Sequence, residues 1–283
     1  MKLKVAIPAG ILLATAGITL AAEEAVNVPG SQYEHPAILS LPDTGADAPA
    51  VLLIHGFASD KNEVGGFYAN LAAQLAERGI ASLRFDFPGS GDHTVGFESN
   101  NWSTFIRDTG EVFDWLAAHD GVDSEHLAVV GFSLGGAIAS NLAGNDDRVD
   151  ALALWSAAGH MAGSQEDLYD TYYETAVTEG YAEADLGFRT ANLSAEYFES
   201  RYSAFPLNDI RSYTGPLLLV NGLLDTSVPV HTARDYVQNA GSLDVTMRIL
   251  PESDHIFNVL TDDLTDSQTV LDLTTNWLDE RLN

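Results

Sequence analysis

The sequence predicts an α/β protein with a mostly parallel central sheet that helices cover on both faces. One observation is a nearly continuous apolar run at residues 50–55, Ala-Val-Leu-Leu-Ile-His, which is typical of a strand buried on both faces of a parallel sheet. Another is the regular alternation of such runs with helical patterns, which implies right-handed crossovers between parallel strands. The length of 283 residues and the hydrophobic content of 46% allow one large core.

Two weak strand candidates come first, at 32–34 and 37–41, with turn residues at 29–30 and 42–45. From residue 50 onward, strand and helix patterns alternate without an internal repeat or a low-complexity linker. The predicted strands then lie at 50–55, 80–85, 127–130, 149–155, 216–220 and 245–250. The predicted helices lie near 67–78 and 104–119, from 136 onward, and near 231–238 and 266–281.

Residues 161–214 break this alternation. The segment is rich in tyrosine, phenylalanine and acidic residues, and it is too long for an ordinary connection between a strand and a helix. We interpret it as an insertion that lies over the carboxyl edge of the sheet. We expect most of its aromatic residues to form a small core of its own and a few to line a pocket.

Residues 1–22 have the pattern of a secretory signal, with early lysines, a mostly apolar stretch and two alanines at its end. An uncleaved anchor is the lesser alternative, because the stretch is short for a spanning helix and contains Pro8. The chain has no cysteine, so disulfides are excluded and the core alone must hold the fold. We therefore predict a signal peptide at 1–22, one domain at 23–283, a secreted or periplasmic location and no stable membrane association after cleavage.

The composition is strongly acidic, with a formal net charge of −28 and a pI near 4.2. Lys61 is the only lysine beyond position 4. Such a chain repels nucleic acid at low salt, so we predict no nucleic-acid partner. An acidic surface that only aids solubility is one explanation, and adaptation to high salt, where screening shortens the reach of self-repulsion, is the hypothesis we favour.

The most informative motif is Gly131-Phe-Ser-Leu-Gly135, which follows a predicted strand and precedes a predicted helix. That context is what a nucleophilic Ser133 on a sharp strand-to-helix turn requires. Glycine at both flanks removes the Cβ atoms that would collide in such a turn, and the positive end of the helix faces any negative charge that forms there. The alternative is a glycine-rich loop with an incidental serine, which the flanking strand and helix disfavour.

Two further polar residues follow later strands, at the carboxyl ends where ligands bind in open α/β sheets. Asp225 comes after the strand at 216–220, and His255 comes after the strand at 245–250. Together with Ser133 they occur in the order serine, aspartate, histidine, which is the order of a hydrolase triad on this architecture. In these roles His255 takes the serine proton, while Asp225 orients the imidazole and stabilises its charged form.

A tetrahedral oxyanion also needs hydrogen-bond donors that are in place beforehand. The Leu134 N–H, directly after the serine, is one candidate. The Phe57 N–H, in His55-Gly56-Phe57 after the first long strand, is the other. Each such donor contributes about 3–4 kcal/mol of transition-state stabilisation.

Other polar residues near strand ends are predicted to support the pocket rather than to react. Asp254 is expected to be solvated, and Asp86 and Asp92 to hold a glycine-rich loop by hydrogen bonds. The histidines are scattered without metal-ligand spacing, so no metal site is predicted, and Gly89-Ser-Gly91 lacks the third glycine of a dinucleotide fingerprint. We expect His55 to be structural and His160 and His231 to line the pocket or the surface.

Taken together, several motifs resemble those of the α/β-hydrolase superfamily, and within it the cinnamoyl (feruloyl) esterase-like and prolyl-oligopeptidase-type small hydrolases. These motifs are Leu53-Ile-His-Gly-Phe57, Arg84-Phe-Asp-Phe-Pro-Gly-Ser-Gly-Asp92, Gly131-Phe-Ser-Leu-Gly-Gly136, Asn221-Gly-Leu-Leu-Asp225 with Val228-Pro229, and Ser253-Asp-His255. The resemblance covers residues 30 to 282 and implies the α/β-hydrolase fold, with 161–214 as its cap. It also implies the triad Ser133, Asp225 and His255 and the oxyanion positions Phe57 and Leu134.

The resulting hypothesis is a secreted, cofactor-free serine esterase, monomeric or homodimeric, that cleaves a small-molecule carboxylic ester through an acyl-enzyme on Ser133. The aromatic cap favours a cinnamoyl-type acyl group, with a short-chain acyl group as the alternative. The same residues are also compatible with a peptidase or amidase of the prolyl-oligopeptidase type, with a thioesterase or perhydrolase, and with a non-catalytic binding module on the same fold. Dehalogenases, epoxide hydrolases and dienelactone hydrolases are disfavoured, because the resemblance would then call for another residue in place of Ser133.

Overall fold

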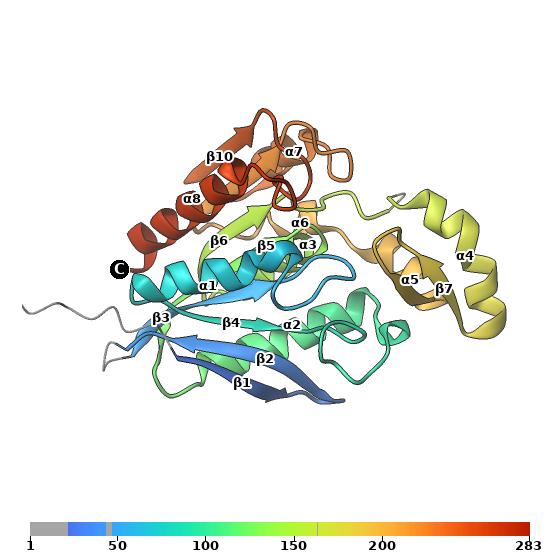
Figure 1. The fold of residues 1–283 in the computed structure, drawn as a ribbon, viewed down its shortest axis with the longest axis horizontal. Coiled ribbons are helices and arrows are strands. Elements are labelled where there is room, and N and C mark those ends of the chain that lie inside the picture. Colours follow the sequence, from blue (N-terminus) through green and yellow to red (C-terminus); the bar gives the residue numbers. More distant parts are fainter. Residues whose placement is uncertain (1–21, 44–46, 163) are drawn as a thin grey trace, which may run out of the picture.

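The computed structural model describes residues 22–43, 47–162 and 164–283, and the predicted signal peptide lies outside them except for its last residue. The strands of the main sheet are β1 Ala22–Pro29, β2 Glu34–Leu41, β3 Ala48–Ile54, β4 Ala81–Phe85, β5 Val122–Phe132, β6 Val149–Trp155, β9 Leu217–Gly222 and β10 Val245–Leu250. They form one sheet in the order β1-β2-β4-β3-β5-β6-β9-β10 (Figure 1). The contacts of β2 with β1 and β4 are antiparallel, and the other neighbouring pairs are parallel. The predicted mostly parallel sheet is confirmed.

The amino-terminal edge of the sheet differs from the sequence prediction. The separate strand predicted at 32–34 is wrong, because the first strand is β1 and the residues before β2 form a tight turn closed by a Gly30 N–H to Tyr33 O hydrogen bond. The strand predicted at 37–41 is the greater part of β2. β1 was missed because it pairs with one neighbour only and carries acidic residues, so it lacks the apolar run of an inner strand.

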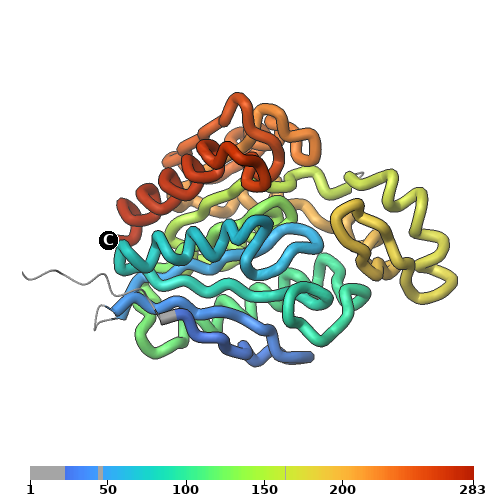
Figure 2. Tube along the Cα trace, viewed as in Figure 1, coloured from blue at the N-terminus to red at the C-terminus, as the bar shows by residue number. Residues whose placement is uncertain are grey.

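Helices cover both faces of the sheet, as predicted. α1 (Phe67–Glu77) and α8 (Thr265–Leu282) pack against each other on one face. On the opposite face α3 (Leu134–Asn145) packs between α2 (Trp102–Ala117) and α6 (Pro206–Asp209), and α6 in turn contacts α7 (His231–Asn239). Figures 1 and 2 show α1 and α8 on the near side of the sheet.

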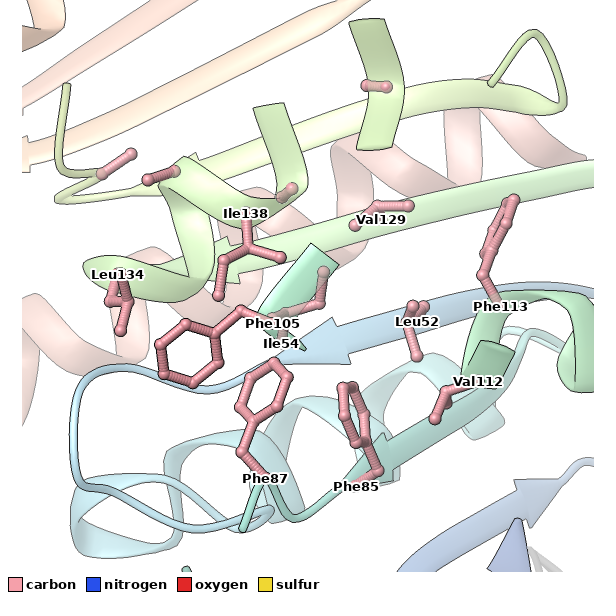
Figure 3. Close-up of a cluster of buried hydrophobic side chains, with 14 of the residues drawn as sticks. Leu52, Ile54, Phe85, Phe87, Phe105, Val112, Phe113, Val129, Leu134 and Ile138 are labelled. Carbon is pink, nitrogen blue, oxygen red and sulfur yellow. The ribbon is translucent and has the colours of Figure 1, made fainter. Parts of the chain in front are cut away.

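The core consists of two apolar layers that the sheet separates. Alternate residues of β3 face opposite layers: Val51 and Leu53 pack toward α1 and α8, whereas Leu52 and Ile54 pack toward α2 and α3. Figure 3 shows the second layer, where side chains of β3, β5, α2 and α3 meet the phenylalanines at the end of β4. A strand buried on both faces must be apolar at every position, which explains the continuous runs that predict the sheet.

Between β6 and β9 the chain forms a separate layer, the cap. It contains α4 Glu166–Glu179, the hairpin β7 Tyr181–Asp185 with β8 Thr190–Ser194, α5 Ala195–Ser200 and a short 3₁₀ turn at Arg201–Ser203. The cap lies beyond the carboxyl ends of the parallel strands, as the yellow segment of Figures 1 and 2 shows. Among the described residues, no helix is long and apolar enough to cross a membrane.

Candidate active site

Ser133 lies at the turn between β5 and α3, with a φ of +53° that residues other than glycine rarely adopt. Glycine on each side makes this turn possible. A Cβ on Gly131 would collide with the Gly135 carbonyl, and a Cβ on Gly135 would collide with the Ile54 carbonyl of β3. The turn therefore has the strained, close-packed backbone that exposes a serine hydroxyl at the end of a strand.

The end of β6 holds this turn in place. The Ser133 N–H donates to Trp155 O at 2.9 Å, and its carbonyl accepts from the Ala158 N–H at 2.9 Å. Gly136, in the first turn of α3, lies so close to Ala157 that a side chain there would collide with it. These contacts fix the backbone of Ser133, because both its N–H and its carbonyl are hydrogen-bonded.

The three predicted catalytic side chains form one continuous hydrogen-bonded chain. His255 Nδ1 lies 2.8 Å from Asp225 Oδ2, and His255 Nε2 lies 3.1 Å from Ser133 Oγ. The Asp225 carboxylate is fully buried, whereas the imidazole is 20% exposed. A carboxylate on Nδ1 selects the tautomer with its proton on that nitrogen, so Nε2 is free to accept the serine proton.

Backbone donors orient the acid. Asp225 Oδ1 accepts hydrogen bonds from Ser227 N at 2.9 Å and Val228 N at 2.8 Å, which leaves Oδ2 to the imidazole. Gly222 at the end of β9 allows the loop before the histidine to pass directly against it, since a Cβ there would collide with Ser253 O. Leu224 N also donates to that carbonyl at 2.9 Å, so the loops of the acid and the histidine are joined.

Asp254 is half-buried, and one of its carboxylate oxygens holds the histidine loop. Its Oδ1 accepts hydrogen bonds from the N–H groups of Ile256 and Asn258, at 3.0 and 2.9 Å. The side chain thus closes a turn around His255, which is the usual behaviour of an aspartate that can reach backbone donors a few residues on. It supports the histidine loop and leaves the imidazole to Asp225.

The two predicted oxyanion residues line the same cavity as Ser133. Leu134 is the first residue of α3, where backbone N–H groups have no partner within the helix. Among the hydrogen bonds of the described residues, neither the Leu134 nor the Phe57 N–H donates to another protein group. Both donors are therefore free to bind an oxygen of a ligand.

Glu63 shapes the loop that carries Phe57, and sequence reasoning missed it. This buried carboxylate accepts a 2.5 Å hydrogen bond from Gly56 N, and its second oxygen accepts from Ser59 Oγ at 2.9 Å and Val64 N at 2.8 Å. Glu63 thereby holds the loop through hydrogen bonds to residues at both of its ends, Gly56 and Val64. Nothing in the local sequence pattern distinguishes Glu63 from a surface acid.

Lys61 joins this loop to the glycine-rich loop after β4. Its ammonium lies 2.5 Å from Asp86 Oδ2 and 2.7 Å from Asp92 Oδ2. Burial alone would lower the pKa of Lys61, but the hydrogen bonds to both carboxylates outweigh it and raise that pKa, while the same contact lowers the pKa of Asp92. Nearby, His55 Nε2 accepts from Phe87 N at 3.2 Å, a structural contact between the same two loops.

The cavity in front of Ser133 has a volume of about 980 Å³ and lies between the sheet and the cap. Its lining is mainly apolar near the serine, with Phe57, Phe132 and Leu134. The cap contributes Met161, Ser164, Gln165, Phe188, Arg189, Tyr197 and Arg201. The cap is tied to the loops beneath it, because the Arg189 guanidinium donates to Ala58 O at 3.2 Å and Gly89 O at 2.8 Å.

The histidines are scattered along the sequence, but the fold brings two of them together. His160, after β6, and His231, at the start of α7, both line the cavity, and their ring centroids are 6.1 Å apart. His160 Nε2 lies 2.7 Å from Asp235 Oδ2, one turn along α7 from His231. This cluster is separate from the hydrogen-bonded chain of Ser133, and the packing of the loop after β6 on α7 brings its members together.

The sheet order, the cap and the serine turn define an α/β-hydrolase. The family model described as the prolyl oligopeptidase family matches residues 66–282. The match covers more than half of the sequence and includes β5, α3 and the loops of Asp225 and His255. The chain therefore belongs to the prolyl oligopeptidase family.

Individual relatives are distant. The chain is 26% identical over 235 residues to a probable carboxylic ester hydrolase, LipM, of Mycobacterium tuberculosis, covering 77% of this chain and 51% of that protein. It is 24% identical over 241 residues to acylamino-acid-releasing enzyme 2 of Oryza sativa, covering 81% of this chain and 30% of that protein. The chain thus spans about half or less of the length of these curated relatives.

Among solved structures, Est1E from Butyrivibrio proteoclasticus with ferulic acid bound is similar, with a TM-score of 0.74 at 21% identity. The match covers 91% of this chain and 99% of that one. At this identity the likeness concerns the fold alone.

Proposed function

We propose that the protein is a carboxylic ester hydrolase that acts through an acyl-enzyme on Ser133. The observation that carries the proposal is the unbroken chain of hydrogen bonds from Asp225 through His255 to the serine hydroxyl. A serine hydroxyl is a poor nucleophile until a base takes its proton, and this arrangement supplies the base and fixes its tautomer.

The reaction follows from these contacts. Ser133 Oγ attacks the ester carbonyl while its proton moves to His255 Nε2, and the oxyanion that forms accepts hydrogen bonds from the N–H groups of Phe57 and Leu134. The tetrahedral intermediate breaks its bond to the alcohol, which leaves with the proton from His255. Water then attacks the acyl-serine, His255 takes the proton of the water and returns it to Ser133 Oγ, and the carboxylic acid leaves.

The cavity favours an acyl group of substantial size. Its volume of about 980 Å³ lies at the upper end of the range for small-molecule sites, and aromatic side chains line it on both the sheet side and the cap side. We assign an aromatic, cinnamoyl-type acyl group on these grounds, with a short-chain acyl group as the alternative. The ferulic acid in the similar Est1E structure supports the same choice.

A peptidase or amidase is the second candidate. It is supported by the family to which the chain belongs and by its similarity to an acylamino-acid-releasing enzyme. The same serine, histidine and aspartate can cleave an amide, because His255 can protonate a leaving amine as well as an alcohol. Secretion through the predicted signal at 1–22 remains part of the proposal for either reaction.

The test combines covalent labelling with a substrate panel. A fluorophosphonate probe should label the wild type, and Ser133→Ala should abolish labelling and lower kcat/KM for p-nitrophenyl esters by at least about 10⁴-fold. Ser156→Ala is a matched control, since Ser156 also has a positive φ at a neighbouring strand end and its buried hydroxyl makes no hydrogen bond within the described chain.

The control should keep both labelling and turnover. A folded wild type that takes up no probe would overturn the hydrolase mechanism and favour a non-catalytic binding protein. Comparing methyl ferulate and p-nitrophenyl acetate with aminoacyl anilides separates the esterase from the peptidase, because the anilides would be turned over faster only by the latter.

A further inference from the structure

We propose that His160, His231 and Asp235 form a binding site for a divalent transition-metal ion of the zinc type at the mouth of the Ser133 cavity. One ring nitrogen from each histidine and one carboxylate oxygen lie within 4.8 Å of one another. Two imidazoles and a carboxylate are a common protein ligand set for Zn²⁺, with water completing a tetrahedral arrangement. The proposal is independent of the esterase reaction.

Helix α7 and the loop after β6 hold the ligands. His231 and Asp235 are four residues apart on α7, so their side chains lie on the same face of that helix, one turn apart. His160 follows β6, and a Cβ on the preceding Gly159 would lie 2.8 Å from Thr232 Cγ2, which shows how closely this loop packs on α7. The cluster is therefore set by the packing of the loop after β6 on α7, where Tyr236 Oη also donates to Ala158 O at 2.8 Å.

The spacing requires only small adjustments. With bonds of about 2.0–2.1 Å, the ligand atoms of a tetrahedral zinc site lie about 3.3 Å apart. His160 Nε2 and Asp235 Oδ2 are already 2.7 Å apart, and both histidines are exposed, so their rings can turn without disturbing the core. Within the described residues, the His231 ring makes no hydrogen bond that an ion would have to displace.

The surroundings favour a cation. The formal net charge of −28 raises the local concentration of cations near the surface. The second cluster with suitable residue types, His35 with Asp108 and Glu111, does not fit an ion, because Asp108 is buried and its two oxygens already bind Arg107 and Tyr33. The cluster at the cavity mouth is open to solvent and so has an entry path.

A bound ion would link His160, the last residue before the cap, to α7. Helix α7 is the helix that follows the loop of Asp225. The cap departs from the sheet directly after His160, at Met161, and its residues line the cavity. We therefore expect the ion to stabilise the mouth of the cavity and to raise the melting temperature by linkage, since the unfolded chain does not hold the three ligands together.

The experiment titrates the metal-stripped full protein with Zn²⁺ in competition with a chromophoric chelator, and with Co²⁺ by visible absorption. One Zn²⁺ per chain should bind with a Kd in the micromolar range or tighter, give a cobalt spectrum with nitrogen ligation, and raise the melting temperature. His160→Ala and His231→Ala should each weaken binding by at least about tenfold and remove the thermal shift. Both are exposed positions, so both variants should fold.

His126→Ala is the matched control, because His126 also pairs with an aspartate, Asp123, at 2.8 Å but has no second histidine as a neighbour. It should bind the ion as the wild type does. The wild type could instead bind several ions weakly, with the same binding in the His160→Ala, His231→Ala and His126→Ala variants. That result would mean general attraction of the ions to surface carboxylates and would overturn the proposal. Failure of the wild type to bind would show that Asp235 is only a hydrogen-bond partner of His160.

Discussion

At the scale of single residues, the site depends on backbone positions that few side chains can occupy. Ser133 has a positive φ, and Gly131 and Gly135 leave no room for a Cβ. Such strain persists only where the surroundings determine the backbone, and here the hydrogen bonds between Ser133 and the end of β6 do so. The serine is thus presented by contacts that lie outside the motif itself.

A second residue-scale feature is His35, buried away from the site. Its ring packs between Tyr33, Phe85 and His93, and neither ring nitrogen forms a hydrogen bond within the described chain. Burial lowers the pKa of His35 to about 4, because the charged form would lose its hydration. Nearby, burial raises the pKa of Asp108 to about 6 despite its hydrogen bonds to Arg107 and Tyr33.

These two shifts act on stability with opposite signs. The folded pKa of His35 is below its unfolded value, so its contribution is present above about pH 6.5 and is lost as the pH falls to about 4, by about 3 kcal/mol in total. The folded pKa of Asp108 is above its unfolded value, so its contribution is present below about pH 3.8 and is lost as the pH rises through about 6.

We therefore predict that His35→Phe reduces the loss of stability on acidification, measured by urea unfolding between about pH 7 and about pH 4.5. Asp108→Asn should make that loss steeper, because it removes the opposing contribution. An unchanged pH dependence in His35→Phe would place the proton uptake on other groups.

At the scale of elements, loops from distant strands converge because parallel strands end at the same edge of the sheet. β5, β9 and β10 present the serine, the aspartate and the histidine, and β3 presents Phe57. Lys61 joins two of these loops through the buried Asp86 and the exposed Asp92, and the buried Glu63 holds the Phe57 loop together. Preorganised donors of this kind make oxyanion stabilisation effective.

The cap is held to this edge by few polar contacts, and Arg189 is the clearest of them. Arg189 lies in the turn between β7 and β8. Its guanidinium donates to the carbonyl of Ala58 in the loop after β3 and to that of Gly89 in the loop after β4. Hydrogen bonds from a charged donor contribute about 1.5–3 kcal/mol each, so their loss should let the cap move away from the cavity.

We predict that Arg189→Leu raises KM for a large aromatic ester about tenfold and changes kcat/KM for p-nitrophenyl acetate much less, since the small ester does not reach the cap. Steady-state kinetics with both esters check this. Arg248→Leu on β10 is the matched control, because Arg248 is exposed and far from the cavity lining. Equal losses on both esters would mean that Arg189 acts on the oxyanion loop instead.

At the scale of the whole molecule, charge is the dominant feature. With 41 acidic residues against 13 lysines and arginines, carboxylates far outnumber the basic groups that could pair with them. α4 shows this clearly, since it carries five acids and no base: Glu166, Asp167, Asp170, Glu174 and Glu179. Repulsion among such groups destabilises the compact state at low ionic strength.

We predict that the melting temperature rises steadily when NaCl is increased from about 0.1 M to about 1 M, because the screening length falls from about 10 Å to about 3 Å. Neutralising part of α4 with Asp167→Asn and Asp170→Asn should reduce the slope. Sucrose stabilises proteins because it is excluded from their surface, and it does not screen charge. A parallel series in sucrose therefore distinguishes charge screening from solvent exclusion as the cause of a rise in melting temperature. A melting temperature that is independent of salt would argue against adaptation to high salt.

Much of the fold could be predicted because inner strands buried on both faces have continuous apolar sequences. The runs at β3, β5 and β6 mark their strands in this way, and the turn of Gly131 to Gly135 identifies the serine. β1 could not be predicted, because an edge strand has weaker hydrophobic constraints. The roles of Lys61 and Arg189 could not be predicted either, because their partners lie on other loops. Glu63 bonds within its own loop, but its sequence neighbourhood resembles ordinary surface.

The sequence by itself determined the strands and helices from residue 50 onward outside 161–214, the serine turn and the candidate acid and base, since each depends on local patterns of burial, turn chemistry or order along the chain. Only the tertiary structure decided which groups meet: the two hydrogen bonds of His255, the salt bridges of Lys61, and the approach of His160 to His231 and Asp235. The reason is physical, because side-chain contacts between distant segments depend on how strands and helices pack, and no local pattern encodes that distance.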